Sequence, residues 1–272
     1  MDIEGKAAVV TGAASGIGQA VALELVRRGV GAIAVVDQAE AVNELAASID
    51  QFTNRRVCVI PCVGDASDAG FRTKVFDEVS AKCGIVRICV PAAGITRDSL
   101  AAKIDRQTGK AALYPIDDFR RVLEINLVAP VYWALEMVGR IAEDRLASGL
   151  GRWQPDEHVQ GTVVFIGSVS SRGNKGQIAY AATKAGLEGA ARTLMQEAMY
   201  HGVRCGVIHP GYTDTPMVRN LGDEFIRDKI LVNTQLRRLI RPEEIADAIC
   251  FMIANSAVSG ELWADAGWQP TV

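Results

Sequence analysis

An α/β fold is predicted for this chain of 272 residues, with a doubly wound, mostly parallel sheet of seven strands and helices on both faces. Two observations predict it. Apolar, β-branched runs alternate with helix-period segments along almost the whole length, which is typical of repeated strand–helix–strand units. Most of these runs are also apolar on both faces, as strands need to be when helices cover the sheet on both sides.

Seven strands and six helices follow from the pattern. The strands are expected at Lys6–Thr11, Ala32–Asp37, Arg56–Cys62, Ile85–Pro91, Thr162–Gly167, Val203–His209 and Glu261–Ala264. The helices are expected at Ile17–Arg28, Glu40–Phe52, Ser67–Lys82, Asp117–Ala147, Ile178–Tyr200 and Pro242–Ile253. Ser67 and Asp117 are candidate N-caps, and Pro242 suits a first helical turn.

These elements are expected to form a single domain, residues 1–272, because no repeat, low-complexity tract or linker divides the chain. Two polar, turn-rich stretches, 105–115 and 148–160, are predicted to be surface insertions before and after the long fourth helix. The irregular stretch 211–235 follows the sixth strand and is a candidate lid. Its apolar residues fit a lid and equally fit an ordinary buried helix; they are Tyr212, Met217, Leu221, Phe225 and Ile226.

The composition argues against two classes of partner. Acids and bases are interspersed and the net charge is -3, so nothing resembles a nucleic-acid-binding surface. No apolar run approaches the ~18 residues that a membrane span needs. The N-terminal stretch MDIEGKAAVVTG also lacks the basic and apolar segments of a signal peptide. We therefore expect a cytoplasmic protein that binds neither nucleic acid nor membrane.

The cysteines and histidines are not expected to bind a metal. The six cysteines stand at 58, 62, 83, 89, 205 and 250 without a C-x-x-C pair. The three histidines, His158, His201 and His209, have no metal-like spacing to them. Most of the cysteines lie within strand or helix patterns, where Cys packs as a small hydrophobe, and we expect reduced thiols.

Three glycines, Gly12, Gly16 and Gly18, separate the first predicted strand from the first helix. In an open α/β sheet, ligands bind outside the carboxyl ends of the strands. Helix N-terminal amides attract an anion at that point, and glycine lets a phosphate approach the backbone. The spacing is G-x-x-x-G-x-G rather than G-x-G-x-x-G, so a tight loop that merely needs glycine stays open as an alternative.

Asp37 strengthens the phosphate-site interpretation. It ends the second predicted strand, nineteen residues after Gly18, where a carboxylate can accept hydrogen bonds from both hydroxyls of an adenosine ribose. Its charge would repel a 2′-phosphate, and neither Ser15 nor Gln38 supplies a cation to offset that repulsion. The sequence therefore favours NAD(H) over NADP(H); the alternative for Asp37 is a solvated acid at a strand end.

Tyr180 and Lys184 stand four residues apart after the fifth predicted strand, so on a helix their side chains share a face. A phenol has a reference pKa of about 10, and a neighbouring ammonium lowers that pKa toward working pH. Ser168 precedes Tyr180 by twelve residues, at the end of the strand, where its hydroxyl can hold a substrate oxygen. A Tyr–Lys pair alone also occurs by chance in many amphipathic helices.

Together these motifs resemble the short-chain dehydrogenase/reductase family, in its single-domain subgroup with a Rossmann-like fold. The resemblance covers essentially the whole chain. It is carried by TGAASGIG (11–18), AAG (92–94), YAATK (180–184), HPGYTDTPM (209–217) and GELWADAG (260–267), and by Asp37, Asp65, Asn126 and Ser168.

The resemblance implies four catalytic residues. Tyr180 is the implied general acid/base, and Ser168 polarises the substrate carbonyl or orients the alcohol. Lys184 binds the nicotinamide ribose and lowers the tyrosine pKa, and Asn126 holds a water that links Lys184 to solvent. Residue 130 is Pro, which has no N–H to bond to the carbonyl of residue 126. We therefore expect a local break at Asn126–Pro130 with a water on that carbonyl; a simple kink that fits the helix to the sheet is the alternative.

The resemblance also implies which residues bind the cofactor. Asp65 would face the adenine amino group, and Thr215 the nicotinamide carboxamide. The full implied set is Gly12, Ser15, Gly16, Ile17, Gly18, Asp37, Gly64, Asp65, Ala92, Ala93, Gly94, Tyr180, Lys184, Pro210, Gly211, Thr213 and Thr215.

Three positions depart from the family pattern. Pro91 stands where the family usually has Asn, so what that side chain secures has to be supplied otherwise. The interval from Ser168 to Tyr180 is one residue shorter than the thirteen expected, and Gly167 occupies the thirteen-residue position without a side chain. His209 replaces a common Asn before the Pro-Gly pair, and we expect it to be structural rather than catalytic.

The resemblance implies an NAD-dependent oxidoreductase that interconverts a secondary alcohol and a ketone. GITRDSL (94–100) is similar to a stretch of 3-oxoacyl-thioester reductases, and the insertion before VVFIGS to one in short-chain 3-hydroxyacyl-CoA dehydrogenases, which also prefer NAD. A 3-hydroxyacyl or 3-oxoacyl thioester is the favoured substrate. Steroid, cyclic or sugar-derived alcohols are alternatives, and a non-catalytic dinucleotide-binding relative is the rival of another class. A homotetramer or homodimer, packed through the fourth and fifth helices, is also implied.

Overall fold

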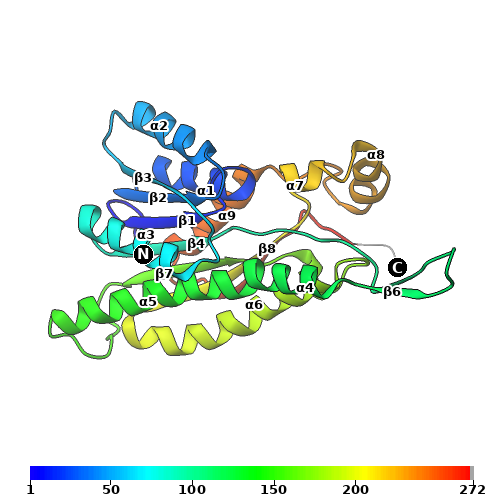
Figure 1. Cartoon of the computed structure of the whole chain (residues 1–272). Helices are drawn as coiled ribbons and strands as arrows, with labels where there is room; N and C mark the ends of the chain where they lie inside the picture. Colours follow the sequence, from blue (N-terminus) through cyan, green and yellow to red (C-terminus); the bar gives the residue numbers. More distant parts are fainter. Residues whose placement is uncertain (270–272) are drawn as a thin grey trace.

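Seven strands form one sheet in the computed structural model, which describes residues 1–269 (Figure 1). The strand order is β3-β2-β1-β4-β7-β8-β9, and each neighbouring pair is parallel. The predicted doubly wound, Rossmann-like α/β fold is thereby confirmed. The strands are β1 (Ala7–Thr11), β2 (Ala32–Asp37), β3 (Cys58–Val63), β4 (Val86–Pro91), β7 (Gly161–Ile166), β8 (Val203–Pro210) and β9 (Gly260–Ala264).

Helices cover both faces of the sheet (Figure 1). Successive strand residues point to opposite faces, so Val10 and Ile33 join one core while Val9 and Ala34 join the other. The first core packs under α1 (Gly16–Arg27), α2 (Ala41–Thr53) and α9 (Pro242–Ala254). The second packs under α3 (Ala69–Cys83), α5 (Ala129–Ala147) and α6 (Ile178–Glu197).

Most predicted elements end within two residues of the observed ones, but two predicted helix caps are wrong. Asp68 caps α3, because the Ser67 hydroxyl is bonded to Asp65 instead, at 2.6 Å. The helix α4 (Ile116–Leu123) has Pro115 at its N-cap, so Asp117 lies inside the first turn. In both cases the helix begins at a different residue from the one predicted, and at α4 no side chain makes a cap bond.

The long fourth predicted helix is interrupted where Pro130 predicts a break. α4 passes into a π-helical turn at Glu124–Val128 before α5 begins. Asn126 lies fully buried in the middle of this turn. The break is confirmed, and the water on its carbonyl stays a prediction. The whole run, Ile116–Ala147, is long and apolar enough to cross a membrane by length and composition alone, but Trp133 is fully buried against the sheet, as in the core helix of a globular domain.

The two predicted insertions differ in structure. The first contains an exposed antiparallel hairpin, β5 (Ala102–Ile104) and β6 (Ala111–Leu113), that projects beyond the sheet (Figure 1). The second, 148–160, is tied to α5 because the buried Arg145 guanidinium donates to the Glu157 carboxylate at 2.6 Å. The hairpin was not expected from the sequence.

One pair of cysteines corrects the expectation that all six thiols are reduced. Cys58 and Cys83 are joined in a disulfide between the start of β3 and the end of α3. They meet because α3 returns along the sheet and ends beside the first residue of the strand that precedes it. The four other cysteines, at 62, 89, 205 and 250, are free and buried as small hydrophobes.

Candidate active site

The glycine turn between β1 and α1 is packed closely against other backbone. Gly12 has a φ of +67°, and a Cβ there would lie 2.8 Å from the Cα of Ala93. A Cβ on Gly18 would lie directly against the carbonyl oxygen of Gly12. Since side chains have no room at these positions, the turn presents bare backbone to the cavity beside it.

The start of α1 adds unpaired amides to this bare turn. Ser15 stands at the N-cap, but its hydroxyl accepts no hydrogen bond from the first turn. No acidic side chain lies in the first turn either. The free amides and the positive end of the helix dipole therefore suit a bound phosphate. These residues fit the diphosphate of a dinucleotide.

Asp37 lies next to the turn at the end of β2. Its Oδ2 accepts from the Ala14 amide and its Oδ1 from the Ala39 amide, each at 3.1 Å. These bonds fix the carboxylate at the edge of the cavity, and an ionised carboxylate keeps further lone pairs for a ribose. Arg121 of α4 lines the same cavity, but its guanidinium donates to Asp65 at 3.2 Å.

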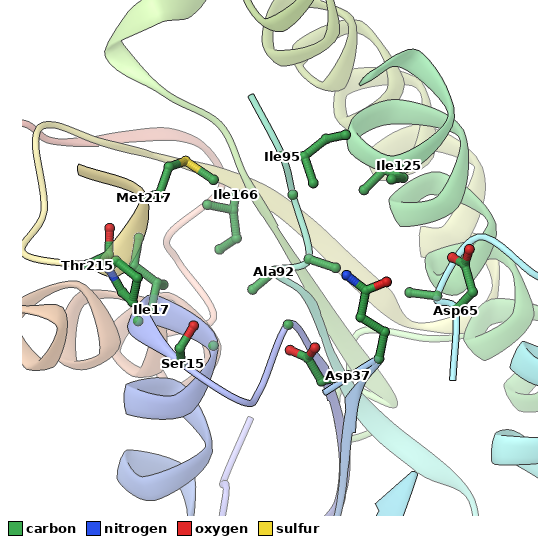
Figure 2. Close-up of a pocket in the computed structure, with 18 of the residues that line it drawn as sticks. Ser15, Ile17, Asp37, Asp65, Ala92, Ile95, Ile125, Ile166, Thr215 and Met217 are labelled. Carbon is green, nitrogen blue, oxygen red and sulfur yellow. The ribbon is translucent and has the colours of Figure 1, made fainter. Parts of the chain in front are cut away.

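A cavity of about 320 Å³ extends along the carboxyl ends of the strands. Figure 2 shows Asp65 at one end of it and Thr215 and Met217 at the other, with Ala92 between them. Most of the predicted cofactor-binding residues line it: Gly12, Ser15, Gly16, Ile17, Gly18, Asp37, Gly64, Asp65, Ala92, Ala93, Gly94, Tyr180, Lys184 and Thr215.

Three of the predicted cofactor residues do not line this cavity. Pro210 ends β8, and Gly211 borders a second, smaller cavity. Thr213 is buried, and its hydroxyl donates to the Gly211 carbonyl at 3.1 Å. After β8 the chain turns back on itself, so Thr215 reaches the cavity and Thr213 holds the turn.

Eight lining residues were absent from the predicted set; Ile95, Pro216 and Met217 lie in the quoted motifs without an assigned role, and the other five reach the cavity only through the fold. Most are apolar or lie on α4 and the turn after it, where sequence spacing gives no signal for a ligand. They are Gln38, Ala66, Ile95, Arg121, Ile125, Ile166, Pro216 and Met217.

One turn of α6 carries both Tyr180 and Lys184 into the cavity, so the predicted shared face is confirmed. The Lys184 Nζ donates to the Ile166 carbonyl at 2.7 Å and lies 5.4 Å from the centre of the Tyr180 ring. Burial lowers the pKa of Lys184 to about 8. Desolvation also raises the pKa of Tyr180 to about 12. The phenol is therefore protonated at neutral pH.

Ser168 reaches Tyr180 despite the short interval between them. It stands at the N-cap of a 3-10 turn, Val169–Arg172, where its Oγ accepts from the Ser170 amide at 3.1 Å. The nearby Ser168 hydroxyl lowers the pKa of the phenol, against the larger effect of desolvation. The tight turn after β7 thus brings the two hydroxyls together.

A second cavity, of about 90 Å³, opens on Ser168 and Tyr180 from the side of the stretch 211–235. It shares Tyr180 and Met217 with the larger cavity, so the phenol stands at the border between the two. Its wall includes Tyr212, Val218 and Leu221 from that stretch. Of the apolar residues predicted there, Ile226 is instead buried in the protein, and Phe225 is exposed.

Asn126 lies behind the large cavity rather than in its wall. Its Oδ1 accepts from the Ile95 amide at 2.9 Å, and its Nδ2 donates to the Ile95 carbonyl at 2.8 Å. It thereby clamps the chain after β4. Pro91 offers no side-chain bond there, and the Thr11 hydroxyl accepts from the Ala93 amide at 3.1 Å. Thr11 therefore secures the segment near the position where the family usually has Asn.

Comparison with known proteins agrees with this geometry. The model of the short chain dehydrogenase family matches residues 6–225. The chain belongs to the short-chain dehydrogenase/reductase family. It is 30% identical over 264 residues to the 3-oxoacyl-acyl-carrier-protein reductase FabG of Salmonella typhimurium, with 96% of each chain covered. It is 33% identical over 258 residues to FabG of Pseudomonas aeruginosa, covering 94% of this chain and 93% of the relative.

A relative with a different substrate name is equally similar. The acetoacetyl-CoA reductase of Synechocystis is 31% identical over 266 residues, covering 96% of this chain and 95% of the relative. Membership in the family makes the chain an oxidoreductase whose cofactor is a nicotinamide dinucleotide. The bare glycine turn and the uncapped start of α1 fit that cofactor.

Proposed function

We propose that the protein is an NAD(H)-dependent dehydrogenase or reductase that interconverts a secondary alcohol and a ketone. The observation that carries the proposal is the position of Tyr180 at the border of two cavities, beside both Ser168 and Lys184. The larger cavity has the backbone features of a dinucleotide site, and the smaller one is open to a substrate. When bound, the nicotinamide supplies or accepts the hydride.

Four side chains or backbone groups of the protein are proposed to handle the proton and to orient the substrate and the ribose. The Tyr180 hydroxyl holds the proton that a substrate oxygen gains or loses, and Ser168 hydrogen-bonds the same region and orients that oxygen. Lys184 is held against the Ile166 carbonyl, within reach of a ribose in the larger cavity. Asn126 fixes the chain after β4 through both bonds to Ile95, so its proposed part in a proton relay depends on its backbone carbonyl.

Asp37 supports NAD(H) as the cofactor. Its carboxylate is fixed by two backbone amides beside the glycine turn, where it can accept from ribose hydroxyls and repel a 2′-phosphate. Arg121 is the nearby cation that could favour the phosphorylated cofactor, but it is paired with Asp65. NAD(H) is therefore the preferred form.

A 3-hydroxyacyl or 3-oxoacyl thioester is the proposed substrate class. The relatives named for 3-oxoacyl-acyl-carrier-protein and acetoacetyl-CoA reduction support it, since both names describe a 3-oxo thioester. The apolar wall of the smaller cavity, with Tyr212, Val218 and Leu221, suits a short acyl chain. Steroid, cyclic or sugar-derived alcohols are the alternative substrates, and a non-catalytic dinucleotide-binding protein is the alternative class.

A homotetramer or homodimer in the cytoplasm completes the proposal, with the stretch 211–235 as the substrate lid of a single catalytic domain. Exposed apolar side chains on α5 and α6 support packing through these helices; they are Tyr132, Leu135, Leu146 and Ile178. Sedimentation velocity would measure the oligomeric state directly.

The experiment that tests the function is a substrate screen followed by NADH absorbance. Secondary alcohols and 3-hydroxyacyl thioesters of increasing chain length are tested with NAD, and with NADP in parallel. We expect the thioesters to give the highest kcat/KM with NAD. Turnover of none of these compounds, with cofactor binding intact, would favour the non-catalytic alternative.

A further inference from the structure

Two of the departures from the family pattern, Gly167 and His209, meet directly beneath Ser168. A Cβ on Gly167 would lie 2.5 Å from Nδ1 and 2.7 Å from Cε1 of His209. The imidazole cannot move aside, because it is fully buried and stacked on Trp263 at a centroid distance of 4.1 Å. A histidine at 209 therefore excludes a side chain at 167, and the two departures are one feature.

The hydrogen bonds of Ser168 indicate which ring nitrogen of His209 carries the proton. His209 Nδ1 lies 3.3 Å from the Ser168 amide and 3.2 Å from the Ser168 carbonyl oxygen. That carbonyl already accepts from the Ser171 amide at 3.1 Å. Within residues 1–269, the buried Ser168 amide donates only to Nδ1. Because the Ser168 amide has no other acceptor, whereas an Nε2–H faces carboxylate oxygens at 3.4 and 3.8 Å, we assign the acceptor role to Nδ1 and the hydrogen to Nε2.

The Nε2 atom of His209 points at two carboxylates. It is buried without a hydrogen bond of good geometry, 3.4 Å from Glu261 Oε2 on β9 and 3.8 Å from Glu188 Oε1 on α6. A cation also lies nearby. The Arg172 guanidinium is 3.7 Å from the centre of the Trp263 indole, on which the His209 ring is stacked. Burial lowers the pKa of His209, against the opposing effects of Ser168 and the two carboxylates, so the ring is neutral at pH 7.

We propose that His209 is a positioning residue for the reaction. With its ring stacked on Trp263 and Nε2 facing Glu261, its Nδ1 accepts from the Ser168 amide and sets the backbone of the shortened turn so that the Ser168 hydroxyl faces Tyr180. The inference rests on the proposed function. It assigns a role to a histidine that the sequence pattern alone leaves as structural.

His209 and the two carboxylates that face it also form a possible metal site. The ligand atoms of Glu188, His209 and Glu261 all lie within 4.8 Å of one another, which is compatible with a metal ion. However, Glu261 Oε1 is paired with Arg192 at 2.6 Å, so a cation already neutralises this carboxylate. With its charge already compensated, Glu261 is a poor metal ligand. We therefore place the Nε2 hydrogen of His209, rather than a metal ion, between His209 and Glu261.

Two substitutions at position 209 separate positioning from packing. In His209→Asn, the amide lies near the position of Nδ1 and keeps an acceptor for Ser168. In His209→Gln, the amide lies nearer to Nε2, and the bond to Ser168 is lost. We expect kcat to fall on the order of tenfold or more for His209→Gln and about threefold for His209→Asn, with the KM for NAD within about twofold of wild type in both. Wild-type kcat in a folded His209→Gln protein would overturn the proposal.

A second pair of variants keeps the test informative if His209→Gln does not fold. Glu261→Gln is expected to lower kcat more than Glu188→Gln, its matched control at the longer distance. Gly167→Ser is expected to lower the melting temperature in the wild-type background and less in His209→Ala, where no atom stands at the position of Nδ1. Equal effects of the two Glu variants, or equal effects of Gly167→Ser in both backgrounds, would contradict the proposal.

Failure of this inference can be told apart from failure of the proposed function. The nitrogen chemical shifts of His209, measured by NMR without any substrate, report which ring nitrogen carries the hydrogen. We expect the Nε2–H form even if no substrate is turned over. The Nδ1–H form would overturn the positioning role. Stoichiometric zinc in the purified protein, lost in His209→Asn, would replace it with a metal site.

Discussion

The active-site region has a dinucleotide end, at β1, β2 and β3, and a reaction end, at β7, β8 and α6, and the two are held by different contacts. At the dinucleotide end, bare backbone is proposed to bind the cofactor, since Gly12 and Gly18 leave no room for a side chain. At the reaction end, polar side chains contact one another in the protein interior: Ser168 lies beside Tyr180, and its amide donates to His209. Substitutions at the first end are therefore expected to change binding, and those at the second end to change turnover.

Replacing Tyr180 with Phe is expected to show this separation most strongly. The variant loses the hydroxyl that holds the transferred proton, so kcat should fall by about 10²–10⁴-fold, the usual range for general acid–base catalysis. NADH fluorescence titration should give a Kd within about threefold of wild type, because the glycine turn and Asp37 are unchanged and the ring of residue 180 stays in the cavity wall. Unchanged turnover would show that Tyr180 is not the acid/base and would remove the central assumption of the proposed function.

Adding a methyl group at Gly12 is expected to give the opposite result. Gly12→Ala forces a side chain into a positive-φ position against Ala93, so the turn has to shift or strain. We expect the Kd for NADH to rise on the order of 100-fold, while kcat at saturating cofactor changes little. Gly139→Ala is the matched control, because a Cβ at Gly139 on α5 meets nothing within 4 Å. The control should keep wild-type binding and gain about 0.5–1 kcal/mol of stability.

Lys184 provides a pH-dependent contrast at the reaction end. Burial lowers its pKa to about 8, below the usual value of 10.5, so the folded protein releases this proton before the unfolded chain does. The unfolded chain binds more protons between these values, and stability should therefore rise as the pH increases from about 8 to 10. The gain is up to about 3 kcal/mol.

Urea unfolding at pH 7, 8, 9 and 10 measures this effect. The rise should be absent in Lys184→Met and present in Lys175→Met, which removes an exposed lysine. Tyr180 acts in the opposite direction only above pH 10, because its pKa is raised from 10 to about 12. A flat difference between wild type and Lys184→Met across this range would contradict a depressed lysine pKa.

The contrast between the two ends also explains what could be predicted from the sequence. The glycine turn and Asp37 were predictable, because each works through a local backbone requirement at the end of a strand. The alternation of strands and helices likewise predicted the sheet, since each element shows its own periodicity. Pro130 predicted the π-helical break for the same reason, because a missing N–H acts on its own turn.

Contacts between residues that are far apart in the sequence were not predictable. The approach of Arg121 to Asp65, the pairing of Cys58 with Cys83 and the contact of His209 with Gly167 all join residues far apart in the sequence. The hairpin β5–β6 is missed for a different reason: its strands have three residues each and are exposed, so they show no burial pattern. Thr213, Pro210 and Gly211 lie outside the larger cavity, because a motif does not show which way a turn faces, and their part in cofactor binding stays a prediction.

The smallest expected effect concerns the choice of cofactor at the dinucleotide end. Asp37→Asn keeps one oxygen that can accept from the Ala14 amide, so the turn should hold its shape. It removes the negative charge that opposes a 2′-phosphate, while Arg121 on the same cavity stays paired with Asp65. We expect the ratio of kcat/KM for NAD to that for NADP to fall by about tenfold, which corresponds to about 1.4 kcal/mol.

Arg121→Gln in the same background distinguishes the two sources of that change. If relief of repulsion by Asp37 is the cause, the double variant keeps most of the shift toward NADP. If Arg121 instead leaves Asp65 and binds the 2′-phosphate, the shift is lost in the double variant. A wild-type protein that already prefers NADP would show that pairing with Asp65 does not withdraw Arg121 from the ligand, and the two acids at this end would then orient a cation rather than a ribose.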